Sequence, residues 1–237
     1  ALPGSRFGVS AEALADGLPE GIEGLHFHAL CESSSYDLEK VLSAFEAGFG
    51  HLIPSLKWVN MGGGHLMTRQ GYDTEHLIKT ISEFRSRHPH LKVILEPGSA
   101  FTWRTGDLAA SVVDIVENDG ISTAILDVSF ACHMPDTLEM PYRPDVLESV
   151  DKEQSNGRLY RLGGNSCLSG DFMGDYYFPE DLKIGDRITL RDMNHYTTVK
   201  TNMFNGVQHP DMVLSRIGGE VEILRHFDYS DYKNRMS

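Results

Sequence analysis

Apolar positions in the first hundred residues alternate between two spacings. Short strand-like runs lie at residues 6–9, 24–30, 56–61 and 91–95. Between them, residues 36–49 and 73–84 carry apolar side chains three and four positions apart, which is the spacing of one helix face. A shorter helix, capped by Ser10, is expected through Leu14. Strands that alternate with helices of this length predict βαβ units whose strands pair in parallel.

The pattern changes near residue 106. Asn118-Asp119-Gly120 separates the strand-like runs 112–117 and 121–128, and this tripeptide is typical of a tight hairpin. Further strand-like runs follow at residues 158–162, 186–191, 197–202 and 220–225. No long helical pattern interrupts them. The sequence therefore predicts two domains, an α/β part over residues 1–105 and an antiparallel β-barrel or sandwich over residues 106–237.

The α/β part is small for a closed barrel. A (β/α)8 barrel needs roughly 250 residues, and about four strand–helix units fit before residue 105. Two architectures remain open at this point. The first part is either a small open sheet or a portion of a barrel that begins elsewhere.

Composition narrows the class of protein. The 237 residues carry a formal net charge of −13, which disfavours nucleic acid and anionic membranes as partners. No apolar run approaches the roughly 20 residues that span a bilayer. Three widely spaced cysteines argue against a disulfide framework and favour the reducing cytoplasm. An acidic surface also suits a polycationic substrate, although solubility alone explains it.

Chemically useful residues follow the predicted strands, where the functional groups of parallel α/β folds collect. His26-Phe27-His28 ends one strand, three consecutive glycines, Gly62 to Gly64, end the next, and Glu96-Pro97-Gly98 ends the last. A glycine run lets the backbone approach a ligand and aim N–H groups at an anion. A tight turn explains the glycines equally well. A core histidine and a salt-bridged glutamate are the corresponding structural explanations for His28 and Glu96.

The order of these three pieces resembles the barrel domain of the pyridoxal-phosphate decarboxylases of fold type III, which are related to alanine racemase. The resemblance implies that residues 1–105 are the carboxyl-terminal part of a (β/α)8 barrel that binds pyridoxal 5'-phosphate. It implies that His28 stacks on the cofactor ring and that Glu96 pairs with the ring nitrogen. The implied phosphate contacts are Gly62, Gly63, Gly64, Gly98 and Ser99. A carboxylate at the ring nitrogen keeps that nitrogen protonated, which helps the ring accept the electrons left by decarboxylation.

The second half contains a matching set in the same order. Residues 164–171, Gly-Asn-Ser-Cys-Leu-Ser-Gly-Asp, resemble the cysteine loop that reaches into the neighbouring subunit's active site in this family. The resemblance implies that the Cys167 thiol returns a proton to the substrate carbon. A buried, inert cysteine is the alternative, which a polar, glycine-rich loop makes less attractive. Tyr196 falls on the tyrosine that touches the phosphate, with ordinary packing as its alternative.

Two departures from the commoner members of the family indicate which group within it the chain resembles. Ser99 stands where ornithine- and diaminopimelate-type enzymes have a phosphate-binding arginine, and Leu168 stands where they have an acid. The chain looks like the carboxynorspermidine decarboxylase group. The segments that carry this resemblance are residues 30–32, 96–101, 139–144 and 167–171. This group converts carboxynorspermidine or carboxyspermidine to norspermidine or spermidine in polyamine biosynthesis. The resemblance implies a cytoplasmic homodimer with shared active sites.

The substrate contacts stay open between candidates. Asp136 or Asp171 is expected to meet the distal amine of the carboxylated polyamine. Arg143 either orients a carboxylate or is a surface arginine in a Pro-flanked loop.

One family feature is absent. Members attach the cofactor through a lysine on an early barrel strand, and no lysine here has that setting. The sequence around Lys40, Lys79 and Lys152 is typical of helices or loops. Strands begin, and do not end, at Lys57 and Lys92. The matching segment would precede Ala1. We therefore expect a truncated, processed or split protein, with a missing amino-terminal segment as companion.

Two other functions remain. A metal-dependent hydrolase would use His26, His28, His65 and His133, but it leaves Glu96 and the cysteine loop unexplained. A catalytically inactive paralogue would bind polyamines or a partner enzyme, and the missing lysine favours it. The decarboxylase hypothesis itself requires no metal.

Overall fold

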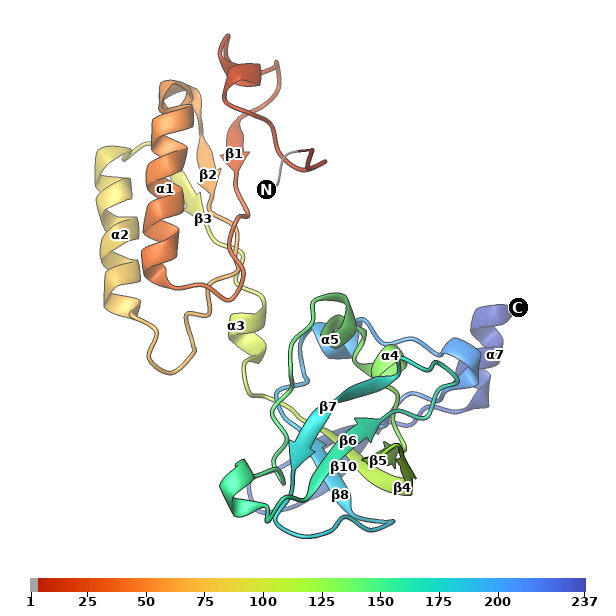
Figure 1. The fold of residues 1–237 in the computed structure, drawn as a ribbon. Helices are drawn as coiled ribbons and strands as arrows, with labels where there is room; N and C mark the ends of the chain where they lie inside the picture. The colour runs from red at the N-terminus through yellow and green to blue at the C-terminus, as the bar shows by residue number, and fades with distance from the viewer. Residues whose placement is uncertain (1–3) are drawn as a thin grey trace. The chain divides into compact units, whose positions relative to one another are not determined.

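The structure, a computed structural model, describes residues 4–237. The chain divides into two compact units, Ala1–Trp103 and Arg104–Ser237 (Figure 1). Among the described residues, no helix is long and apolar enough to cross a membrane.

The first unit is a three-stranded parallel sheet with helices between its strands. Its strands, in the spatial order β1-β2-β3, are β1 (Gly24–His26), β2 (Trp58–Asn60) and β3 (Lys92–Ile94). Helices α1 (Ser35–Phe49) and α2 (Thr74–Arg87) lie side by side against the sheet (Figure 1). Short helical turns complete the unit: η1 (Glu12–Leu14), η2 (Gly50–Ser55) and α3 (Ser99–Thr102). The predicted alternation of parallel strands and helices is confirmed here.

Both long helices begin at a side-chain cap. Ser34 and Asp37 form a reciprocal capping box at the start of α1, and Asp73 caps α2. Hydrogen bonds from Ser34 lower the pKa of Asp37 to about 2. The apolar faces of the helices enter one core with the central strand; its buried members include Leu38, Leu42, Phe45, Val59, Leu77 and Phe84.

The second unit is built on a five-stranded sheet in the order β7-β6-β5-β4-β8. Its strands are β4 (Leu108–Asn118), β5 (Ile121–Leu126), β6 (Leu159–Gly163), β7 (Phe172–Tyr177) and β8 (Arg187–Leu190). The predicted hairpin joins β4 to β5. Asp119 and Gly120 at its tip have φ of 50° and 76°, and both values favour this two-residue turn.

This sheet is mixed, so the prediction of an antiparallel domain was wrong in one pairing. β5 and β6 run parallel, because the 32 residues between Leu126 and Leu159 form a crossover and not a hairpin. The sheet is also curled. The connecting segment bridges one edge through Val146 and Leu190, and the other edge through Val150 and Tyr177.

Two predicted strands are not formed. Residues 6–9 make no strand and are exposed, with Gly8 at a φ of 83°. The helix expected through Leu14 is only the turn η1, without a side-chain cap. Residues 197–202 do not form a strand and begin in helix α6 (Tyr196–Val199). There the Thr198 hydroxyl donates to the backbone carbonyl of Met193, and the Thr197 hydroxyl donates to Asp136 Oδ2.

Several elements were not predicted. Besides η2, α3 and β7, they are the short helices α4 (Phe130–His133) and α5 (Pro135–Glu139), the turns η3 (Lys152–Gln154) and η4 (Phe204–Gly206), strand β9 (Met212–Ser215) and helix α7 (Tyr229–Met236). β9 forms a separate exposed hairpin with β10 (Val221–Arg225), whose strand-like pattern was recognised.

Candidate functional site

The glycine run of the first unit follows the central strand β2 and contacts the segments that follow both outer strands. The N–H of Gly62 donates to Asn60 Oδ1 over 2.9 Å, and the N–H of Gly63 donates to His28 Nδ1 over 3.2 Å. The carbonyl of Gly62 accepts from the N–H of Glu96 over 2.7 Å. The glycines therefore connect the segment after β1 to the segment after β3.

Close backbone packing explains why all three positions are glycine. A Cβ would lie 2.5 Å from Phe27 O at Gly62, 2.2 Å from Glu96 O at Gly63 and 1.9 Å from Leu30 O at Gly64. Such contacts with rigid backbone atoms exclude any larger residue. The tight-turn explanation is thus sufficient for the glycines, and two of their three N–H groups already donate within the protein.

Glu96 lies beside His26 and His28, with about half of its side chain exposed. Its Oε1 accepts a 2.6 Å hydrogen bond from Asn60 Nδ2, and its Oε2 lies 3.4 Å from His26 Nε2. Ligand atoms of His26, His28 and Glu96 all lie within 4.8 Å of one another. Three of the predicted segments therefore meet at one edge of the sheet.

The hydrogen bond at His28 restricts its chemistry. An amide N–H can only donate, so Nδ1 must carry a lone pair and the proton of the neutral ring lies on Nε2. With the proton on Nε2, neither ring nitrogen has a free lone pair for a metal ion. This geometry disfavours the metal-dependent reading of the cluster.

The other two histidines of the metal hypothesis lie elsewhere. His65 is buried, its Nδ1 lies 2.7 Å from the Tyr72 hydroxyl, and burial lowers its pKa. Burial raises the pKa of Tyr72 to about 12. His133 belongs to the second unit, where its Nδ1 accepts the N–H of Ser129 over 3.1 Å. Within residues 4–237, His26, His28 and Glu96 form the only group of three potential metal ligands.

Gly98 and Ser99 follow Glu96 after one intervening residue, Pro97. Gly98 is the N-cap of α3, and its carbonyl accepts the N–H of Phe101 over 2.9 Å. A Cβ at Gly98 would meet no atom within 4 Å, so packing does not require this glycine.

In the second unit, the backbone of Ala131 in α4 forms hydrogen bonds with two loops, which contain Asp171 and Asn202. The N–H of Ala131 donates to Asp171 Oδ1 over 3.0 Å, and its carbonyl accepts from Asn202 Nδ2 over 3.0 Å. The other oxygen of Asp171 accepts the N–H of Ser166 over 3.1 Å. Asp171 is 4 % exposed, and its carboxylate stabilises the cysteine loop.

The two loops bring a donor to the Cys167 thiol. Asn205 Nδ2 donates to Cys167 Sγ over 2.9 Å, and both side chains are exposed. Asn205 has a φ of 54°, a backbone conformation that asparagine tolerates better than most residues. Cys132, by contrast, is buried. Cys167 therefore has the accessibility that proton transfer requires.

Asp136 is a buried carboxylate with one unsatisfied oxygen. It lies in α5 and is 6 % exposed. Its Oδ2 accepts hydrogen bonds from the Tyr142 hydroxyl over 2.8 Å and from the Thr197 hydroxyl over 3.3 Å. Its Oδ1 has no hydrogen-bond partner within residues 4–237. A buried, partly unpaired carboxylate can stabilise a cation there.

The remaining two candidates are on the surface of the second unit. The Arg143 guanidinium donates to the carbonyl of Asp175 and lies 4.1 Å from the ring centroid of Tyr176, so local contacts already occupy it. Tyr196 begins α6 and is 59 % exposed.

Sequence reasoning missed Asn60, His26 and Asn205 as partners of the predicted residues. Asn60 lies two positions before the first glycine of the run, and this position was the available signal. The contact of Asn205 with Cys167 joins residues 38 positions apart, which no local pattern indicates.

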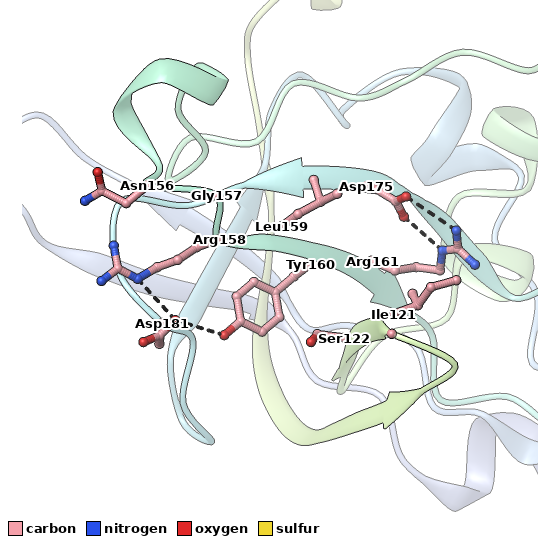
Figure 2. Close-up of a pocket in the computed structure, with 11 residues that line it drawn as sticks. Ile121, Ser122, Asn156, Gly157, Arg158, Leu159, Tyr160, Arg161, Asp175 and Asp181 are labelled. Carbon is pink, nitrogen blue, oxygen red and sulfur yellow. Dashed lines mark hydrogen bonds and ion pairs between the residues drawn. The ribbon is translucent and has the colours of Figure 1, made fainter.

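An open cleft of about 470 Å³ lies apart from these residues (Figure 2). It lies between the β4–β5 turn and the start of β6. Its arginines are paired, Arg158 with Asp181 at 3.1 Å and Arg161 with Asp175 at 2.9 Å (Figure 2). Because its charges are neutralised internally, the cleft offers little to a charged ligand.

Comparison with known proteins places these features in context. Residues 35–194 match the family model described as pyridoxal-dependent decarboxylase, C-terminal sheet domain. A carboxyaminopropylagmatine decarboxylase of Synechocystis sp. is 53 % identical over 235 residues, which cover 99 % of this chain and 60 % of that protein. A carboxynorspermidine/carboxyspermidine decarboxylase of Campylobacter jejuni is 46 % identical over 241 residues, covering 98 % and 63 %.

A solved structure agrees with the sequence comparisons. The crystal structure of carboxynorspermidine decarboxylase complexed with norspermidine from Campylobacter jejuni superimposes with a TM-score of 0.88 at 45 % identity. The match covers 98 % of this chain and 66 % of that one. The chain thus spans less than two thirds of the length of these relatives.

Proposed function

The chain belongs to the pyridoxal-dependent decarboxylase family, and from that premise we propose that it supplies part of the active site of a carboxy-lyase acting on a carboxylated polyamine in polyamine biosynthesis. The names of its relatives offer three substrates: carboxynorspermidine, carboxyspermidine and carboxyaminopropylagmatine. Carboxyaminopropylagmatine was not among the substrates expected from the sequence. The observation that carries the proposal is the meeting of Glu96, His28 and the glycine run at one sheet edge.

The architecture we propose has two parts. Residues 1–105 are a portion of a (β/α)8 barrel, which the parallel order β1-β2-β3 supports. Residues 106–237 are the sheet domain in this proposal, and the match to the sheet-domain family model, over residues 35–194, includes its first part. A lysine supplied outside residues 1–237 attaches the cofactor in this proposal. The whole enzyme is a cytoplasmic homodimer with shared active sites.

The residues of the first unit fit a pyridoxal 5'-phosphate ring. A half-exposed carboxylate, with one oxygen held by Asn60, is suited to a protonated ring nitrogen. His28 lies next to that carboxylate with its ring orientation fixed by Gly63. Gly62 to Gly64, Gly98, Ser99 and Tyr196 are the proposed phosphate contacts. Because Gly62 and Gly63 donate internally, Gly64 is the glycine whose N–H we favour for that contact.

When bound, the cofactor supplies an electron sink for the carbanion left by loss of carbon dioxide. The chain's own residues would then act as follows. Glu96 holds the proton at the ring nitrogen, His28 packs on the ring, and the Cys167 thiol gives its proton to the substrate carbon.

For the distal amine, the contacts favour Asp136 over Asp171. Asp136 keeps a buried oxygen without a partner, whereas both oxygens of Asp171 accept backbone N–H groups. Its charge would pair with an ammonium group of the polyamine. Arg143 is held by Asp175 and Tyr176, so carboxylate binding would require it to leave both contacts.

A fusion tests the function directly. The amino-terminal part of the Campylobacter jejuni relative is joined to residues 1–237, and the fusion is incubated with pyridoxal 5'-phosphate and each of the three substrates. We expect carbon dioxide release from at least one substrate. We also expect Cys167→Ala to reduce the yield of the decarboxylated amine. If a folded fusion that binds the cofactor releases no carbon dioxide from any of the three, the proposal is wrong.

A further inference from the structure

Asn60 is the last residue of β2, and only 9 % of it is exposed. Its side chain lies between the glycine run and Glu96. Oδ1 accepts the N–H of Gly62 over 2.9 Å, and Nδ2 donates to Glu96 Oε1 over 2.6 Å.

These contacts fix which way the amide faces. A backbone N–H can only donate, so the atom facing Gly62 must be the oxygen. The nitrogen then necessarily faces the carboxylate. The assignment therefore rests on the chemistry of the partner and does not depend on distinguishing the two amide atoms by position.

We propose that Asn60 is a positioning residue that fixes Glu96 and couples it to the glycine run; this inference rests on the proposed function only where it assigns Glu96 to the cofactor ring. The amide hydrogen bond stabilises the ionised carboxylate and holds Oε1. Oε2, which lies 3.4 Å from His26 Nε2, is then the oxygen that the amide does not hold and that a ligand would contact. Because the same amide holds Gly62, displacement of the glycine run would displace the carboxylate.

The first test uses the unmodified chain without cofactor. If the hydrogen bond exists in solution, the side-chain NH2 resonances of Asn60 must shift with pH at the same midpoint as the 13C carboxyl resonance of Glu96. In Glu96→Gln, this shift should disappear. Asn60 resonances that do not follow the Glu96 titration would overturn the proposal, whatever the fate of the decarboxylase function.

The second test is a double-mutant cycle. Asn60→Asp keeps an oxygen for the Gly62 N–H but opposes two carboxylates, so we expect it to lower the free energy of unfolding at neutral pH. Combining Asn60→Asp with Glu96→Gln reverses donor and acceptor and should restore most of the lost stability. A coupling of about tenfold or more in the unfolding equilibrium constant is expected.

A matched control separates this coupling from added charge. Asn118→Asp introduces the same charge at an exposed position of the β4–β5 hairpin, in the other unit. It should show no coupling to Glu96→Gln. Additive effects of Asn60→Asp and Glu96→Gln would contradict the proposal, even if the fusion enzyme proved active.

Discussion

The backbone N–H of Gly63 donates to Nδ1 of His28 over 3.2 Å. This contact places the proton of the neutral imidazole on Nε2 and fixes the orientation of the ring beside Glu96. A histidine held in this way is suited to packing and donating, and it is poorly suited to metal coordination.

The tautomer predicts weak metal binding at this cluster. Zn²⁺ added to the chain should bind weakly, and His28→Ala should not change the affinity, because Nε2 carries a proton. Calorimetric titration of both proteins measures this, and long-range 1H–15N spectra identify the protonated nitrogen. Tight one-to-one binding that His28→Ala abolishes would restore the metal hypothesis.

The glycine run should tolerate no side chain at Gly63. In Gly63→Ala the new Cβ would meet the Glu96 carbonyl at 2.2 Å, so the strand ends must separate. We expect a loss of about 1–3 kcal/mol of unfolding free energy, measured by urea denaturation. Gly50→Ala is the control, since its Cβ meets nothing within 4 Å and its φ of −57° is helical. Equal stability of the two variants would refute this packing explanation.

The Asn205–Cys167 contact predicts a thiol whose reactivity depends on the amide. In a Cys31→Ser background, Cys167 is the one exposed thiol of the described chain. Asn205→Gly keeps the left-handed backbone and removes the donor that stabilises the thiolate, so alkylation by iodoacetamide should become slower. Asn205→Asp should slow the alkylation further, because a carboxylate repels the thiolate.

Asn156→Gly is the matched control for that experiment. Asn156 also has a positive φ, of 51°, and lies on another loop of the same unit. Its substitution should leave the alkylation profile unchanged. An unchanged profile in Asn205→Gly would mean that the amide does not contact the thiol in solution.

Asp136 and Asp171 should respond differently to the same substitution. Asp136→Asn removes a buried charge from the proposed ammonium contact, so norspermidine affinity should fall at least about tenfold with little loss of stability. Asp171→Asn should chiefly lower stability, because both oxygens hold backbone N–H groups. Calorimetry on the fusion enzyme and urea denaturation of the chain separate the two effects. The reverse pattern would assign the amine to Asp171.

Local patterns predicted most of this fold where a residue's neighbours in sequence decide its structure. The helix from Ser35 to Phe49 has both a side-chain cap and a helical apolar face, and the β4–β5 turn has the required asparagine, aspartate and glycine. The parallel pairing of β5 with β6 depends on the path of the chain through a long connection. No local pattern indicates such a path.

In the candidate site, too, some features could be predicted from local sequence and others could not. Glu96, His28 and the glycines follow recognisable strands, so their meeting at one edge could be anticipated. The hydrogen bonds of Asn60, Asn205 and Asp171 to their partners depend on tertiary packing. For Asp171, no sequence pattern distinguishes a carboxylate that binds substrate from one that holds its own loop.

His133 predicts a specific acid sensitivity of the second unit. It is 2 % exposed, and burial, reinforced by His209, lowers its pKa from 6.5 to about 4. The unfolded chain therefore binds a proton near pH 6.5 that the folded protein refuses until about pH 4. Stability from this residue is present above pH 6.5 and is lost as the pH falls toward 4, by up to about 3 kcal/mol.

His133→Asn keeps an acceptor for the Ser129 N–H and cannot titrate, so its urea midpoint should fall less between pH 7 and pH 4.5 than that of the unmodified chain. His51→Asn, at an exposed histidine of the first unit, should not reduce the fall. If His133→Asn loses as much stability as the unmodified chain over this range, the acid sensitivity belongs to the carboxylates and not to this buried ring.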